Sequence, residues 1–245
     1  MLQQHKEEAL KLYVDFHTHA TKRGSFLYGN SLSGTEQVEN LIFAKLVSLN
    51  SINFDFAECN FAERIMTIKD KRDGLSREGS SRVSLYKETG LVNCYTFECN
   101  YHNAKRLNYI PRRIDTRTNK LVPETPITDV RSEIYAGKEP PAYNVELFKD
   151  IGKGLGLGLL DYYGLNPISR VPMSIYKTLE NLRKEIAITK VPNSTKRLKG
   201  KFAKKSKGSE LIVTLVVKEK GENGIYEIKE EVLSAEENIQ KDNHN

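Results

Sequence analysis

The sequence predicts an α/β fold, because two hydrophobic periods alternate along it. Apolar and polar residues alternate with a period of two, as in half-buried strands, in residues 12–20, 51–61, 83–90 and 91–101. Apolar residues at helical spacing occur in residues 36–50 and 144–164. With 245 residues, 38% of them hydrophobic, the chain can form one domain with a sizeable core, or one domain plus a tail.

Composition limits the class of protein. A mean hydropathy of -0.53 and the absence of a long apolar run argue against a membrane partner. The polar N-terminal residues lack the pattern of a secretory signal, and three cysteines suit a reducing compartment, so we expect a cytoplasmic protein. The cysteines lie in strand-like runs, which favours buried side chains over a disulfide framework. The net charge of +6 predicts an acidic partner or substrate.

The N-terminal region is expected to form a strand after one or two helical turns in residues 5–12. In the strand over residues 12–20, Val14 and Phe16 face one way, and Asp15, His17 and His19 face the other. A glycine-punctuated basic loop then leads to the helix over 36–50 and to the strand over 51–61.

The middle of the chain begins with a charged surface loop over residues 69–82, which is rich in Gly and Ser. Two strands joined by a glycine turn are expected next, over 83–90 and 91–101. Residues 102–143 contain five prolines and form a long irregular stretch, which is usually functional or disordered.

The helix over 144–164 has Asn144 as its expected N-cap, and Glu146 and Asp150 suit its early turns. Its glycines do not form a phosphate-binding loop, because no strand leads into them and no Gly-Lys-Ser/Thr sequence closes them. They predict instead a helix that packs closely on a sheet. We expect a basic, partly disordered tail over 166–245, with a last strand over 210–219.

His17 and His19 are the first candidate site residues. Two histidines separated by one residue on a strand share a face and could both reach a metal ion, and the alternative is a hydrogen-bonded or half-exposed pair. A catalytic zinc normally takes three protein ligands and keeps one position for water. This pair supplies at most two of them.

Glu98 is the second candidate, a carboxylate within an otherwise apolar strand-like run. Such a group needs a partner or a function. It could pair with an Arg or Lys, or it could act as a general base whose pKa is raised by partial burial.

Arg77 and Arg82 lie in the loop before the run over 83–90. A surface arginine is by default a solvated charge. The alternative is a clamp for a substrate carboxylate, which a guanidinium binds in bidentate fashion.

Four separated stretches together resemble the cytosolic carboxypeptidases, zinc metallocarboxypeptidases that remove glutamates from tubulin. These are residues 14–31, 37–61, 69–83 and 95–101. The most similar branch is the one associated with removing branch-point glutamates from polyglutamylated side chains. The resemblance covers about residues 13–165 in order.

The resemblance implies an α/β/α sandwich on a mixed sheet, of which residues 1–165 would be the C-terminal half and 166–245 the basic tail. It implies a zinc-bound water that a glutamate deprotonates and that attacks the peptide carbonyl. By the match of motifs, His17 would be a zinc ligand and Glu98 the catalytic base, whereas His19 is not an expected ligand. Arg82, and second Arg77, would bind the substrate glutamate side chain.

The resemblance also implies a cofactor and partners: one Zn²⁺ for each complete domain, and tubulin or other polyglutamylated acidic tails. It implies a cytoplasmic location, with association with microtubules or cilia as a further expectation. The family takes two further zinc ligands from an upstream His-x-x-Glu motif. Here that pattern occurs at His5 and Glu8, with the wrong separation from His17, so we interpret it as a coincidence and expect weak or no zinc binding by this chain alone.

Two alternatives to catalysis stay open. The chain could be an inactive binding module that docks acidic tubulin tails through its basic loop and tail. Nucleic acid is a less favoured partner of the lysine-rich run over 196–207, because no aromatic-interleaved or known nucleic-acid motif accompanies it.

Overall fold

The computed structural model describes residues 10–69, 74, 76–191, 213–220 and 226–233. The chain divides into two compact units, residues 1–195 and residues 196–245. The expected helical turns over 5–12 lie largely outside the described residues.

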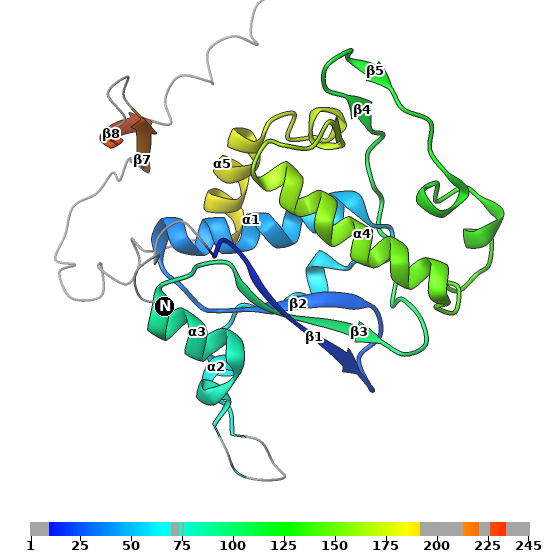
Figure 1. The fold of residues 1–245 in the computed structure, drawn as a ribbon, viewed down its shortest axis with the longest axis horizontal. Coiled ribbons are helices and arrows are strands. Elements are labelled where there is room, and N and C mark those ends of the chain that lie inside the picture. The colour runs from blue at the N-terminus through cyan, green and yellow to red at the C-terminus, as the bar shows by residue number, and fades with distance from the viewer. Residues whose placement is uncertain (1–9, 70–73, 75, 192–212, 221–225, 234–245) are drawn as a thin grey trace, which may run out of the picture. The chain divides into compact units, whose positions relative to one another are not determined.

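A three-stranded mixed sheet organises the first unit (Figure 1). Its order is β1-β3-β2, and the strands are β1 (Tyr13–His19), β2 (Ser25–Gly29) and β3 (Cys94–Asn100). The central strand β3 pairs in parallel with β1 and antiparallel with β2. The predicted α/β class and the predicted strands over 12–20 and 91–101 are confirmed.

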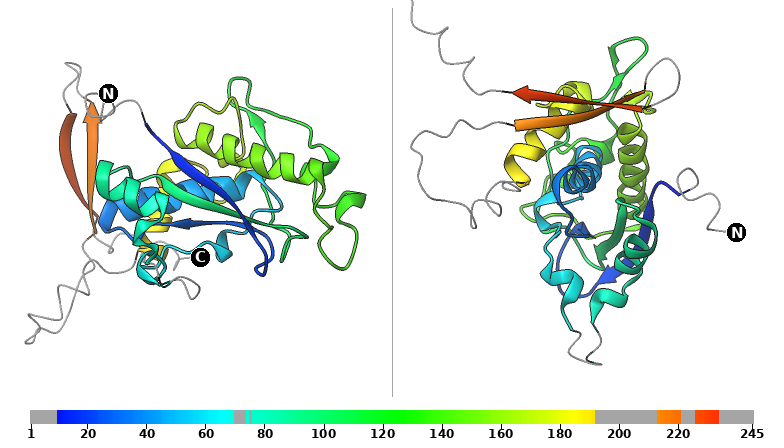
Figure 2. Two further views of the ribbon diagram at one scale, coloured as in Figure 1. Left: turned by 60° about the horizontal axis from the view of Figure 1, so that its bottom comes forward. Right: turned by 90° about the vertical axis from the view of Figure 1, so that its left-hand side faces the viewer.

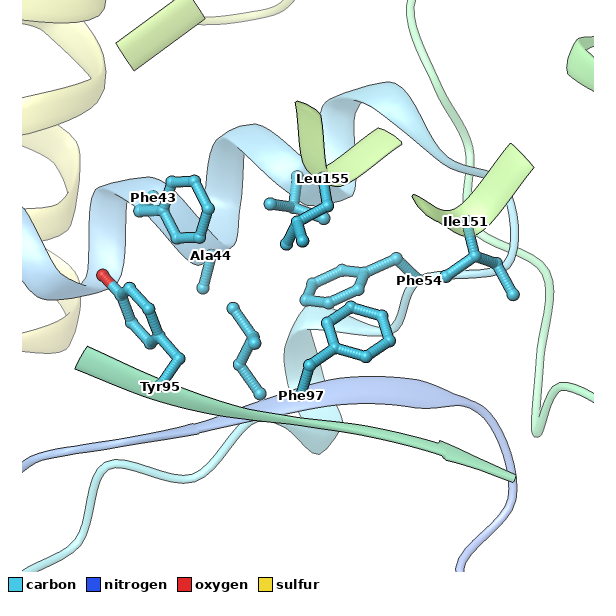
Figure 3. Packing of buried hydrophobic residues seen from close by; sticks show 9 residues of the cluster. Phe43, Ala44, Phe54, Tyr95, Phe97, Ile151 and Leu155 are labelled. Carbon is cyan, nitrogen blue, oxygen red and sulfur yellow. The ribbon is translucent and has the colours of Figure 1, made fainter. Parts of the chain in front are cut away.

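Two long helices, α1 (Gly34–Asn50) and α4 (Val145–Tyr162), pack on one face of this sheet, and both predicted helices are confirmed. Figure 3 shows Phe43 and Ala44 of α1 facing the strand that carries Tyr95 and Phe97. Alternate side chains of the central strand therefore enter this core. The buried members of the core are Leu27, Phe43, Ala44, Val47, Phe54, Tyr95, Phe97, Ile151 and Leu155.

The glycines of α4 permit a close approach, as predicted, but the partner is α1 rather than the sheet. A Cβ on Gly158 would lie 2.9 Å from the backbone nitrogen of Val47. A Cβ on Gly154 would lie 2.8 Å from the Cβ of Ser51, just after α1. The predicted N-cap is also confirmed, because the Asn144 side chain accepts a hydrogen bond from a backbone amide in the first turn of α4.

Two predicted strands are wrong. In residues 51–61 the Asp55 side chain accepts a hydrogen bond from the Ala57 amide and starts the 3-10 turn η1 (Phe56–Glu58), so the capping contact outweighs the alternating pattern. Residues 83–89 belong to the helix α3 (Ser81–Thr89), which is capped by Gly90 with a φ of 72°. A glycine in this left-handed conformation is a common helix C-terminus.

The proline-containing stretch after residue 101 is irregular, as predicted, and it is folded. Ile110 and Tyr135 pack with Ile52 and Leu147 in a small core of their own. Its short elements are β4 (Ile114–Asp115), β5 (Lys120–Leu121), η3 (Pro126–Thr128) and η4 (Glu133–Tyr135). The remaining short elements of this unit are α2 (Arg64–Thr67), η2 (Arg77–Gly79), β6 (Ile168–Ser169) and η5 (Val171–Met173).

Residues 166–191, which were expected to begin the tail, contribute α5 (Leu179–Lys190) to the first unit. Leu182 and Ile186 of α5 are buried in one cluster with Leu46 of α1. This apolar contact ties the segment to the helical layer. The boundary between the two units therefore lies after residue 195 rather than after residue 165.

The second unit contains an antiparallel hairpin of β7 (Val213–Lys220) and β8 (Tyr226–Leu233), seen as the orange and red strands of Figure 2. Its register pairs Val213 with Leu233 and Lys220 with Tyr226. The predicted strand over 210–219 is confirmed, whereas β8 was not predicted.

Candidate functional site

The candidate site lies on the sheet face that points away from the core of α1 and α4. Side chains on a strand alternate between faces, so Thr96 and Glu98 of β3 face away from the core that receives Tyr95 and Phe97. In the parallel register, His17 of β1 lies beside Glu98. The fold therefore brings the two principal candidates, His17 and Glu98, to adjacent positions on one face.

His17 is held by a neighbour on its own strand. Its Nε2 lies 2.9 Å from Oδ2 of Asp15, and 53% of its side chain is exposed. With the proton on Nε2 and donated to Asp15, Nδ1 keeps a lone pair. A carboxylate that orients an imidazole in this way is typical of metal-binding histidines, so His17 is suited to be one metal ligand.

His19 has a local structural contact instead. Its Nδ1 accepts a hydrogen bond of 2.9 Å from the backbone amide of Lys22, in the turn after β1. Its ring packs near Phe26, with the ring centroids 5.7 Å apart. This contact engages one ring nitrogen of His19 in the turn.

Glu98 occupies the central strand, with His17 beside it on β1 and Phe26 beside it on β2. The residue is 8% exposed, so the burial expected for it is confirmed. Its role as a general base remains a prediction.

Arg82 lies on the helix α3 and not in a loop, which corrects the predicted local structure. It is 3% exposed, so the interpretation as a solvated surface charge is wrong. Nη1 donates to Oγ1 of Thr96 over 3.3 Å, and Nη2 donates to the carbonyl oxygen of Ile65 over 3.2 Å. Because Thr96 precedes Glu98 by two residues, Arg82 reaches the same face of the sheet.

The other predicted residues are not brought to this face by the described structure. Arg77 begins the short turn η2, and its side chain lies outside what the structure describes. His5 and Glu8 lie outside the described residues.

The described residues do not complete a zinc site. Among them, no group of three or more His, Cys, Asp or Glu side chains could hold a metal ion. Burial raises the pKa of the Cys59 and Cys94 thiols to about 12 and that of Cys99 to about 11, so these groups stay protonated at neutral pH. The predicted burial is confirmed for Cys94, whereas Cys59 and Cys99 are partly exposed. His17 is left as the candidate ligand.

Two positioning residues were not assigned from the sequence. Asp15 orients His17, and Thr96 receives Arg82. The period-two spacing of Asp15 and His17 could have indicated the first contact. Nothing local indicates the second, because Arg82 and Thr96 belong to a helix and a strand that meet only in the fold.

Comparison with known proteins gives the family. A rat protein named cytosolic carboxypeptidase-like protein 5 is 43% identical over 179 residues, or 73% of this chain. The human protein of that name is 42% identical over 179 residues, and the zebrafish protein is 41% identical over 191 residues, or 78% of this chain. The chain is homologous to the cytosolic carboxypeptidases. The resemblance drawn from the sequence is thereby confirmed.

This cytosolic carboxypeptidase homologue covers only part of its relatives. It spans 20% of the length of the rat protein and 19% of the human protein. Human cytosolic carboxypeptidase 6 is more distant, at 26% identity over 165 residues, or 65% of this chain. No family model matches the sequence. In the described part of the chain, no helix is both long and apolar enough to cross a membrane.

Proposed function

We propose that this chain forms part of the catalytic domain of a cytosolic zinc carboxypeptidase that removes glutamates from polyglutamylated acidic tails, those of tubulin among them. The observation that carries the proposal is the register between His17 and Glu98, with Arg82 on the same sheet face. Homology to proteins named carboxypeptidases supports the hydrolase class.

Glu98 is proposed as the general base. A buried carboxylate on a central strand has a fixed position, and it can take a proton from the attacking water and return it to the leaving amine. Peptide hydrolysis requires both transfers, and one carboxylate can perform both.

His17 is proposed as one zinc ligand, with Asp15 fixing its ring. The chemistry expected from zinc is polarisation of the scissile carbonyl. The described residues supply no set of three ligands. The further zinc ligands are therefore proposed to lie outside the described residues. The proposed cofactor is therefore one Zn²⁺ for each complete domain.

Arg82 is proposed to bind the substrate carboxylate, with Arg77 as a second candidate. The contacts with Thr96 and Ile65 hold the Arg82 guanidinium at the sheet face that carries Glu98. A guanidinium fixed in this way presents a planar set of N–H donors, which matches the two oxygens of a carboxylate. The net charge of +6 also favours acidic tails as substrates.

The proposed fold of the complete domain is an α/β/α sandwich. Its support is the placement of helices on both faces of the sheet: α1 and α4 on one face, and α3 through Arg82 on the other. The proposed location is the cytoplasm. The relatives are named cytosolic, which agrees with this location.

The proposal is tested by adding Zn²⁺ to the chain and measuring bound zinc and glutamate release from a peptide with a polyglutamate tail. We expect His17→Ala to bind less zinc than the native chain and to release less glutamate. If the native chain binds zinc, equal zinc binding by His17→Ala would contradict the role given to His17.

A second candidate function is a binding module that docks acidic tails without cutting them. The net charge of +6 favours it, together with the lack of a three-ligand group among the described residues. Salt-sensitive binding of the same peptide, with no glutamate release in the presence of zinc, would support this function against catalysis by this chain.

A further inference from the structure

A cavity of about 250 Å³ lies beside α4, on elements that do not include the candidate site. It is lined by one side of α4 from Glu146 to Leu157, the end of α1 and the stretches around β4, η3 and β6. Its charged or amide-bearing lining residues include Asn50, Arg113, Asp150, Lys153 and Arg170. Cavities for drug-sized ligands measure about 300–1,000 Å³, so this one suits a smaller molecule, of amino-acid size.

Asp150 is the distinctive group in this cavity. It was expected to be an acidic residue of an early helical turn, but it is only 6% exposed, and its Oδ2 has no hydrogen-bond partner among the described residues. Burial raises the pKa of this carboxyl group to about 6, so it is still mainly ionised at neutral pH. Buried polar groups are usually satisfied, so this oxygen needs a donor.

Asn50 supplies a second acceptor. It is 3% exposed, and its Nδ2 donates to Oδ2 of Asp161 over 2.7 Å, while its Oδ1 has no partner among the described residues. Asn50 and Asp150 thus each offer an oxygen without a donor, and both line the same cavity. Two such acceptors match the several N–H donors of one ammonium group.

The remaining charged lining residues are four cations and one carboxylate: Arg113, Lys149, Lys153, Arg170 and Glu146. Glu146 pairs with Lys149 over 2.8 Å. Arg170 makes two hydrogen bonds to Glu124, of 2.9 and 2.7 Å, and Arg113 lies 3.6 Å from the same carboxylate. One carboxylate therefore serves two guanidinium groups. Lys153 is exposed and makes no ion pair with a described residue. The cavity thus combines acceptors for a cationic group with an excess of cationic side chains.

We propose that this cavity binds a small zwitterion, an α-amino acid with an acidic side chain, whose ammonium group contacts Asp150 and Asn50 and whose carboxylates face Arg113 and Lys153. The cavity shares none of its lining residues with the site of His17, Glu98 and Arg82. Binding at the cavity can therefore fail without affecting the proposed function, and the reverse also holds.

The test is calorimetric titration of the full chain with two probes, L-glutamate and glutarate. Glutarate keeps both carboxylates and lacks the ammonium group. We expect glutamate to bind about tenfold more tightly, the effect of a hydrogen bond to a charged group. Asp150→Asn should remove this preference and leave glutarate binding unchanged. Glu139→Gln, a carboxylate-to-amide change at an exposed residue outside the cavity lining, should change neither affinity.

Three results would overturn the proposal: equal affinities of the native chain for the two probes, full glutamate affinity in Asp150→Asn, or no binding of glutamate by the folded native chain. The comparison of the two probes needs only the native chain, so it holds even if Asp150→Asn does not fold. Arg113→Gln gives a second variant, which should lower the affinity for both probes by a similar factor.

Discussion

The two faces of the β1-β3-β2 sheet differ in chemistry, although both are built from the same strands. On one face Tyr95 and Phe97 are 0% and 4% exposed and pack under α1 and α4. On the other, Thr96 and Glu98 are 7% and 8% exposed. Burial is therefore nearly equal on the two faces of β3. Alternation along β3 thus places apolar side chains on one face and polar side chains on the other, although both sets are buried.

The edge strand β1 is exposed on both faces, whereas β3 is buried on both. Phe16 pairs with Phe97 in the register, with the rings 5.5 Å apart, yet it is 65% exposed. His17, on the other face, has 53% of its side chain exposed. The other edge strand, β2, is by contrast largely buried. The parity of the residue determines which face it joins.

The largest effect on stability is expected from the apolar face. Phe97→Ala should lower the free energy of unfolding by about 3–5 kcal/mol, because it removes a buried ring and leaves a cavity. Urea unfolding of this variant measures the loss. Glu98→Gln keeps the shape of the side chain and should cost clearly less. Equal losses of unfolding free energy in Phe97→Ala and Glu98→Gln would contradict the distinction between the apolar and the polar face of the sheet.

The next largest effect on stability is expected from Asp150, a buried carboxylate outside the sheet. The pKa of Asp150 is raised from 3.8 to about 6, so the folded protein binds this proton more tightly than the unfolded chain. The stabilisation is full below pH 3.8 and is lost as the pH rises through about 6, which amounts to about 3 kcal/mol. Asp150→Asn should lack this contribution to the fall in stability between about pH 4 and pH 7. Thermal unfolding at several pH values would measure it, and an unchanged slope would contradict the burial of an ionised Asp150.

The packing of α4 on α1 gives a smaller effect with an internal control. Gly158→Ala would place a Cβ against the Val47 backbone and should destabilise by about 1–3 kcal/mol. Gly156→Ala meets nothing within 4 Å and should stabilise by about 1 kcal/mol through helix propensity. Denaturant midpoints of the two variants should therefore move in opposite directions. A shift in the same direction would show that α4 does not approach α1 at Gly158.

The smallest effect on stability is expected at the partly exposed pair of Asp15 and His17, on the sheet face that carries Glu98. Asp15→Asn should change the free energy of unfolding by less than about 1 kcal/mol, because solvent screens the pair with the half-exposed His17. Urea unfolding measures this change too. A loss as large as that of Phe97→Ala would show that the polar face is part of the structural core.

Strong periodic patterns predicted much of this fold. The strand with His17, the strand with Glu98 and the two long helices were all found. The alternation in 51–61 failed, because the side chain of Asp55 caps a turn there. The pattern in 83–90 failed, because a helix begins at Ser81 and is capped by Gly90. Short runs of about eight residues fit a strand or a helix equally well, and the glycine was the better indicator.

The candidate site was predictable in part. Residue type and resemblance made His17 and Glu98 candidates, but their adjacency depends on the parallel register of two strands that are far apart in the sequence. The burial of Arg82 could not be predicted, because it depends on the contact of α3 with Thr96. Asp150 was assigned to an early helical turn, since sequence position alone does not show which face of a helix meets a cavity.

The central claim is that the polar face of the sheet carries out peptide hydrolysis with Glu98 as base. The most direct measurement is glutamate release from a polyglutamate-tailed peptide, in the presence of Zn²⁺, by the native chain, Glu98→Gln and the exposed control Glu180→Gln. We expect a loss of about 10²–10⁴-fold in Glu98→Gln and native activity in Glu180→Gln. Glutamate release by Glu98→Gln at the native rate would contradict the claim.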